Sequence, residues 1–117
     1  MANSLKRGLV VLAIYPFTDL SSAKRRPALV VSATGRPGRD CILAFITSGA
    51  RQIEATDLML DPTSGDFAAT GLRAASVVRC GKLMTLDRTL LTGRLGRLSE
   101  RLMAEVDIRL KKALALR

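Results

Sequence analysis

Three short stretches of the sequence place cations or hydroxyls at an apolar segment. The first is AKRRPALVVS (residues 23–32), in which Lys24, Arg25 and Arg26 precede Pro27 and a β-branched run. Because proline restricts the residue before it to extended backbone, Arg26 is held at the entrance of the following strand. Its guanidinium presents a fixed fork of donors that suits phosphate. We interpret Arg26 as a phosphate ligand, and Lys24 and Arg25 either as further ligands or as solvated loop residues.

The second stretch is ITSG (residues 46–49), where Thr47 and Ser48 close an apolar run just before Gly49. Hydroxyls and backbone N–H groups at a strand end can hold a phosphate or polarise a reacting oxygen. The same side chains can instead satisfy the backbone groups of a simple turn. Taken alone, this stretch favours the turn.

The third stretch is SVVRC (residues 76–80), which places Arg79 inside an apolar strand. An arginine is rarely buried without a partner. Arg79 is therefore expected to point outward, to pair with an acid or to line a cleft.

The chain as a whole is strongly basic. It has 117 residues, enough for one domain, and a net charge of +9 from 19 basic and 10 acidic residues. Such an excess favours an anionic partner: nucleic acid, an acidic membrane surface or an acidic protein. Cations dominate residues 1–40 and 71–117, whereas acids dominate residues 41–70. This distribution predicts a basic face and a separate acidic segment.

The composition also argues against several kinds of site. Histidine is absent and no CxxC or paired-carboxylate spacing occurs, so neither a metal site nor a cofactor is expected. The chain has one Tyr, three Phe and no Trp, which gives little support for a base-stacking platform or a proline-peptide groove.

Two cysteines, Cys41 and Cys80, lie in strand-like runs, where a thiol behaves as a small buried hydrophobe. The sequence alone does not decide whether Cys41 and Cys80 form a disulfide. The first residues lack the apolar run of a secretory signal, and no run approaches the roughly 20 apolar residues of a membrane span. The expected location is the reducing cytoplasm, with no membrane partner.

The positioning elements are short strands followed by one helix. Apolar runs predict strands at 8–17, 27–32, 41–48, 57–60, 76–80 and 82–86, the last two separated by Gly81. Polar loops are expected at 18–26 and 33–40. From Ser99 onward the apolar residues follow helical spacing, with Ser99 as N-cap. Short, closely spaced strands with a terminal amphipathic helix predict a closed or half-closed antiparallel barrel in one domain, 1–117.

In combination, these stretches resemble the MazF/PemK-like toxins of bacterial toxin–antitoxin pairs. The resemblance runs in order through KRG (6–8), YPFTDLSSAKRRPALVVS, AFITSG, GL (71–72), SVVRC, TLD (85–87) and LSERLMAEVD (98–107). It implies a mainly β (α+β) fold, a small SH3-like antiparallel barrel with a C-terminal helix, usually as a homodimer. It further implies a metal-independent endoribonuclease that cuts single-stranded RNA, and a cognate antitoxin whose acidic tail blocks the RNA groove.

The resemblance also implies roles for individual residues. Arg26 matches the catalytic arginine of the family's RP motif, Thr47 the threonine of its TS motif, and Arg79 the arginine of the PemK-type VVRC strand. Ser48 matches the neighbouring binding position. The other expected RNA contacts are Lys24, Arg25, Ser76 and Phe17.

Two positions depart from the family pattern. Leu9 replaces the acid that commonly follows the first glycine, and Gly81 replaces an aspartate proposed as general base after VVRC. If Gly81 stands at that position, Gly81→Asp should raise cleavage. No obvious base remains, so the alternative to a nuclease is a weakly active or non-catalytic homologue that binds RNA or an antitoxin. A gyrase inhibitor of the CcdB type is disfavoured, because that activity relies on a C-terminal Trp and ALALR has none.

Overall fold

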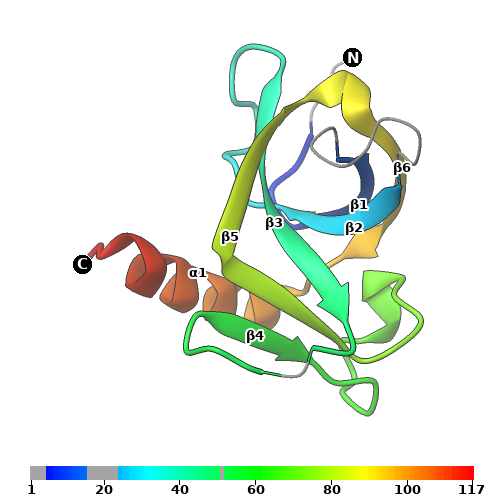
Figure 1. Cartoon of the computed structure of the whole chain (residues 1–117), viewed down its shortest axis with the longest axis vertical. Helices are drawn as coiled ribbons and strands as arrows, with labels where there is room; N and C mark the ends of the chain where they lie inside the picture. The colour runs from blue at the N-terminus through cyan, green and yellow to red at the C-terminus, as the bar shows by residue number, and fades with distance from the viewer. Residues whose placement is uncertain (1–4, 16–23, 51) are drawn as a thin grey trace.

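The computed structural model describes residues 5–15, 24–50 and 52–117. The described residues form one antiparallel sheet in the order β4-β5-β3-β2-β1-β6, followed by a helix (Figure 1). The elements are β1 (Leu9–Ile14), β2 (Arg25–Val30), β3 (Asp40–Ser48), β4 (Asp57–Leu60), η2 (Ala68–Thr70), β5 (Ser76–Asp87), η3 (Arg88–Leu90), β6 (Leu91–Arg97) and α1 (Glu100–Leu114). The predicted mainly β fold with a C-terminal helix is confirmed.

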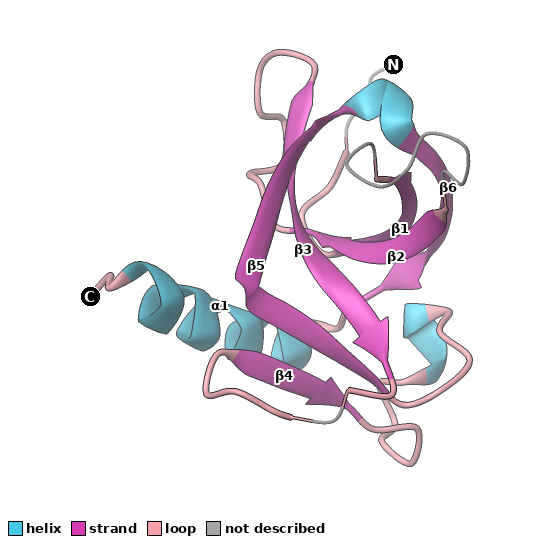
Figure 2. Cartoon of the chain, viewed as in Figure 1, coloured by secondary structure: helices cyan, strands magenta, loops and turns pink. Residues whose placement is uncertain are grey.

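The sheet is strongly curled but does not close on itself. Figure 2 shows β1, β2, β3, β5 and β6 curving around a common hollow, while α1 lies outside the curl near β4 and β5. The edges of the sheet are β4 and β6, which are not paired with each other.

Alternation along the strands divides the core into two clusters. One fills the space between the sheet and α1, and includes Leu29, Val78, Leu102 and Val106. The other fills the hollow of the curl, and includes Ala28, Val30, Leu43 and Tyr15. Adjacent residues of β2 thus point into different clusters, as the period of two requires.

β2 begins two residues earlier than the sequence predicts. Arg25 and Arg26 pair with Ile14 and Ala13 of β1, so both cations belong to the strand rather than to the preceding loop. The extended backbone that Pro27 imposes on Arg26 fits this pairing.

β5 is one long strand where two were expected. Phe45 of β3 pairs with Arg79, whereas the preceding residue, Ala44, pairs with Leu83. Residues 80–82 are therefore extra residues on β5, and they bend the strand as a bulge does. Gly81 marks this irregularity and does not end the strand.

The predicted helix is confirmed at its start. The Ser99 hydroxyl accepts a hydrogen bond from the Leu102 N–H at 3.1 Å, which is the N-cap contact. Leu102 and Val106 form its buried face. Ser99 also donates to Asp66 at 2.6 Å, so the loop after β4 is tied to the helix start.

Both cysteines are buried and free, as small core residues. They lie in different clusters, Cys41 in the hollow and Cys80 beneath the helix. Burial raises the pKa of the Cys80 thiol to about 11, which keeps it protonated near neutral pH. Within the described ranges, no helix combines the length and apolar character needed to cross a membrane.

Candidate functional site

The three residues predicted to be catalytic line one cleft. This cleft has a volume of ≈ 250 Å³. Its walls come from three neighbouring strands, β2, β3 and β5, and are formed by Arg26, Phe45, Ile46, Thr47, Arg79 and Lys82. Residues separated by more than 50 positions in the sequence thus meet in one place.

The strand register explains this convergence. β3 lies between β2 and β5, with Phe45 opposite Ala28 on one side and opposite Arg79 on the other. Arg26 stands two residues before Ala28, and Thr47 stands two residues after Phe45. Because the two strands are antiparallel, Arg26 and Thr47 come to the same level of the sheet. The period of two puts Phe45 and Thr47 on the same face of β3.

Arg79 is held by carboxylates on one side and faces the cleft on the other. Its Nε lies 3.6 Å from Asp57 Oδ1, and its Nη2 lies 4.0 Å from Glu54 Oε1. The side chain of Arg79 is 22% exposed and that of Asp57 only 1%. Of the three placements expected for Arg79, pairing with an acid and lining a cleft both occur.

Phe45 in the wall of the cleft packs against a second aromatic residue, Tyr15. The rings of Tyr15 and Phe45 have centroids 4.6 Å apart, and the Tyr15 hydroxyl donates to the Pro27 carbonyl at 3.3 Å. Burial raises the pKa of Tyr15 to about 12, although the nearby charge of Arg26 acts in the opposite direction. Tyr15 therefore stays protonated near neutral pH and serves as packing beneath Arg26.

The sequence analysis missed Phe45, Ile46 and Lys82 in the wall of the cleft, and Tyr15 next to Phe45. Phe45 could have been found, because it stands two residues before Thr47 on the same face of a predicted strand. Lys82 could not have been found, because it reaches the cleft through the bulge at residues 80–82, and no local sequence pattern predicts that bulge.

The predicted RNA contacts lie at different depths around the cleft. Lys24 and Arg25 are exposed at the start of β2, and Ser48 is exposed at the end of β3. The Thr47 hydroxyl donates to the Ser48 carbonyl at 3.3 Å, which is the kind of local contact expected of a turn. Ser76 pairs with Ser48 but is buried, and its hydroxyl donates to the Ala74 carbonyl at 2.8 Å. Phe17 lies outside the described residues.

The charge of the cleft is cationic on its accessible side. Arg26, Arg79 and Lys82 contribute three positive groups, while the two acids stand beside Arg79. Leu9 packs against the cluster in the hollow, and Gly81 lies in the bulge. Across the described ranges, no three His, Cys, Asp or Glu side chains are grouped so as to hold a metal ion. Such a site can bind a phosphate group and stabilise additional negative charge on it.

A curled antiparallel sheet with one terminal helix and a cationic cleft across three strands defines a small β protein suited to anionic ligands. The family of PemK-like, MazF-like toxins of type II toxin–antitoxin systems matches residues 6–114 of this chain. The chain therefore belongs to that family, as the sequence motifs predicted. Among curated proteins, none matches the chain.

Solved structures share the fold over nearly the whole chain. A mycobacterial endoribonuclease in complex with its cognate antitoxin is 22% identical, with a TM-score of 0.77 and 97% of each chain covered. The Mycobacterium tuberculosis toxin MazF-mt6 is 23% identical, with a TM-score of 0.71 and coverage of 93% of this chain and 98% of that chain. MazF from Deinococcus radiodurans is 22% identical, with a TM-score of 0.71 and coverage of 98% and 100%. At these identities the likeness concerns the fold.

Proposed function

We propose that this protein is an endoribonuclease toxin that cuts single-stranded RNA without a metal ion. The observation that supports this best is the convergence of Arg26, Thr47 and Arg79 on one cleft. Two guanidiniums and a hydroxyl from three adjacent strands suit the phosphate of an RNA backbone. Family membership and the mycobacterial structures described as endoribonucleases agree with this function.

The proposed reaction is an internal transesterification. The 2′-oxygen of one nucleotide attacks the adjacent phosphorus, and the bond from phosphorus to the 5′-oxygen breaks. The products are a 2′,3′-cyclic phosphate and a 5′-hydroxyl. Arg26 and Arg79 stabilise the charge that accumulates on the phosphoryl oxygens, which is an electrostatic role that needs no metal.

The test of this function uses the purified full chain and a long RNA of mixed sequence in excess EDTA. Discrete fragments with cyclic-phosphate and 5′-hydroxyl ends are expected. Intact RNA, or cleavage that stops when EDTA is added, would contradict the proposal.

The positive charge of the cleft also suggests which partners bind there. An acidic antitoxin tail would occupy the cationic cleft in place of RNA, and related chains have been solved with their antitoxins. We further expect a homodimer, and a cytoplasmic location in which RNA is the available substrate.

A second candidate function is a non-catalytic homologue that binds RNA or titrates an antitoxin. The observation that favours it is that Leu9 and Gly81 offer no carboxylate to the cleft. The EDTA experiment separates the two functions when RNA binding is measured alongside cleavage, because a non-catalytic homologue binds RNA and leaves it intact.

A further inference from the structure

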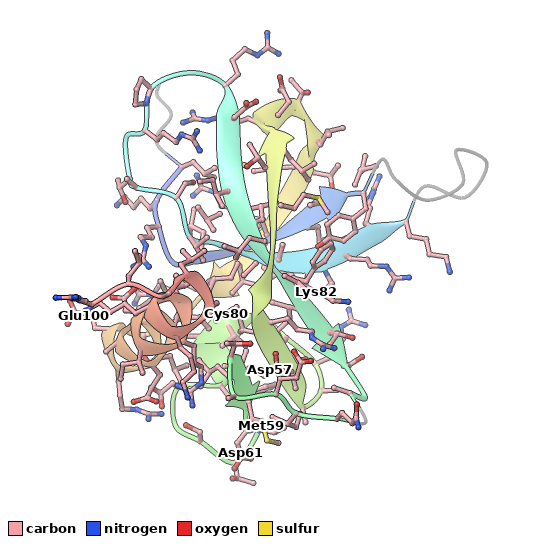
Figure 3. The ribbon with its side chains drawn as sticks, turned by 60° about the vertical axis from the view of Figure 1, so that its left-hand side comes forward. Asp57, Met59, Asp61, Cys80, Lys82 and Glu100 are labelled. Atoms are coloured by element: carbon pink, nitrogen blue, oxygen red, sulfur yellow. The ribbon has the colours of Figure 1, made fainter. Side chains whose placement is uncertain are left out.

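The loop between β3 and β4 delivers two carboxylates to Arg79. Glu54 lies in this loop and Asp57 is the first residue of β4, directly opposite Arg79 in the β4–β5 pairing. Figure 3 shows Asp57 at the start of β4, with Cys80 and Lys82 on the adjacent part of β5. Two carboxylates from another segment of the chain thus lie beside Arg79, the candidate catalytic residue on β5.

Gly81 leaves the space in which this loop packs. A Cβ built at Gly81 would lie 3.0 Å from the Thr56 hydroxyl oxygen, which is tighter than ordinary contact. The Thr56 carbonyl also accepts a hydrogen bond from the Cys80 N–H at 3.2 Å. Gly81, where the family resemblance implies a carboxylate, thus lies against the loop that bears Glu54.

Asp57 is rigidly held. Its Oδ2 accepts a hydrogen bond from the Glu54 N–H at 2.8 Å, and its own N–H donates to the Glu54 carbonyl at 3.0 Å. Its carbonyl accepts from Arg109 of α1 at 2.8 Å. A buried carboxylate with this many fixed contacts offers the nearby guanidinium of Arg79 a charge in a defined position.

Glu54 differs from Asp57 in its exposure. Its backbone is fixed by the two hydrogen bonds to Asp57, but its side chain is 65% exposed and reaches only to 4.0 Å from Arg79. A carboxylate with an anchored backbone and a free end is able to approach a substrate hydroxyl next to Arg79. Such contacts commonly shorten only when the substrate is bound.

We propose that Glu54 accepts the proton of the attacking 2′-hydroxyl, and that Asp57 is the positioning residue that aims Arg79 at the phosphate. The proposal rests on the endoribonuclease function proposed above. It assigns the base role left open by Gly81 and Leu9 to a different part of the chain.

The proton and electron pairs balance as follows. The Glu54 carboxylate takes the 2′-hydroxyl proton, the 2′-oxygen forms a bond to phosphorus, and the bond to the 5′-oxygen breaks with its electron pair on that oxygen. Water protonates the departing 5′-oxygen. Glu54 then returns its proton to solvent, and no oxidant or metal takes part.

The first test is Glu54→Gln in the full chain, with cleavage followed under single-turnover conditions. Well-placed proton transfer contributes roughly 10²–10⁴-fold, so the cleavage rate should fall by about 10²-fold or more. The affinity for a 2′-O-methyl RNA, which cannot react, should be unchanged or stronger because a negative charge is lost.

The matched control is Glu100→Gln. Glu100 is an exposed glutamate in the first turn of α1, away from the β4–β5 contact (Figure 3). This variant should cut at the parent rate. A Glu54→Gln protein that cuts like the parent would overturn the proposal while leaving the endoribonuclease function intact. If the parent itself leaves RNA intact, both the proposed function and the role of Glu54 are wrong.

The second test addresses Asp57 through its partner. Asp57→Asn keeps an oxygen for the Glu54 N–H but removes the charge next to Arg79. Cleavage should fall in the parent background and fall no further in an Arg79→Ala background, because Asp57 acts through Arg79. Equal losses in both backgrounds would show that Asp57 serves the fold only. A melting curve for each variant identifies any that do not fold, and the exposed Glu54 variant decides the base role independently.

Discussion

Gly81 and Thr56 lie so close together that a Cβ at position 81 would make the Thr56 side chain give way by a few tenths of an ångström. The Thr56 hydroxyl oxygen would be 3.0 Å from a Cβ at position 81. The backbone at Gly81 does not have a positive φ, so the constraint is one of space and not of backbone strain. Thr56 belongs to the loop that carries Glu54, so a change at Gly81 acts on that loop.

From this contact we predict the opposite of what the family resemblance implies for Gly81→Asp. The variant should fold but cut more slowly than the parent, because the new side chain presses on the Thr56 side chain in the loop that carries Glu54. Adding Thr56→Ala should recover part of the loss by removing the hydroxyl that is in the way. Single-turnover rates on the single and double variants check this. A Gly81→Asp protein that cuts faster than the parent would restore the sequence-based expectation.

Arg26→Ala should abolish cleavage while leaving the melting temperature almost unchanged. Arg26 is exposed at the start of β2, so its removal leaves no cavity in the core. Its loss removes a charge-assisted contact that strengthens as charge builds on the phosphate, an effect on the order of 10²–10³-fold for one such donor. Arg26→Lys should also fail, because a point charge cannot reproduce the guanidinium fork. Cleavage at the parent rate by Arg26→Ala would show that the site is wrongly assigned.

Short local signals explain what the sequence could predict. Pro27 fixes the extended backbone of Arg26, and Ser99 marks the start of α1, and both effects act within a few residues. The apolar run at 57–60 gave the bounds of β4 correctly. Arg79 was singled out because a lone cation in an apolar strand needs a partner.

Long-range packing explains what the sequence could not predict. β6 (Leu91–Arg97) was missed because its letters, LTGRLGR, suggest a loop with two glycines. Gly96 is required there since a Cβ would lie 2.1 Å from the Ala69 carbonyl oxygen, a neighbour that only the fold brings close. Likewise, the contacts of Arg79 with Glu54 and Asp57 depend on the β4–β5 pairing, which local patterns do not encode.

RNA binding should weaken steeply with salt. Each cation that neutralises a phosphate of a single strand contributes a slope of roughly 0.7 in a log–log plot of affinity against salt. Lys82 lines the cleft, so Lys82→Ala should reduce the slope by about that amount. Titrations with 2′-O-methyl RNA at several salt concentrations measure it, with Lys111→Ala at the end of α1 as the control. A slope near zero for the parent would mean that the positive charge serves another ligand.

The protein should be a homodimer at micromolar concentration. The open sheet leaves β4 and β6 as edges, and Met59 of β4 is exposed, as is Ile108 of α1. Unpaired strand edges and apolar side chains are surfaces that a second copy can cover. Sedimentation velocity checks the expectation. A single monomeric species across micromolar concentrations would contradict it.

The stability of the fold should depend on the charge of Asp66 and should therefore fall at low pH. Its carboxylate accepts hydrogen bonds from Arg101, Ser99 and Ser64, and the pair with Arg101 spans 2.9 Å. These contacts, with Arg101 first, hold the pKa of Asp66 well below its ordinary value.

A carboxyl group whose pKa is lower in the folded than in the unfolded chain stabilises the fold fully above its unfolded pKa, about 3.9 for Asp. That contribution is lost as the pH falls from there through the folded pKa. Asp66→Asn should therefore lower the melting temperature at pH 7, and the gap from the parent should narrow below about pH 4. Asp40→Asn, at an exposed position at the start of β3, is the control and should melt like the parent throughout. A gap for Asp66→Asn that stays constant down to about pH 2 would show that the hydrogen-bond geometry, and not the charge of Asp66, holds the loop against α1.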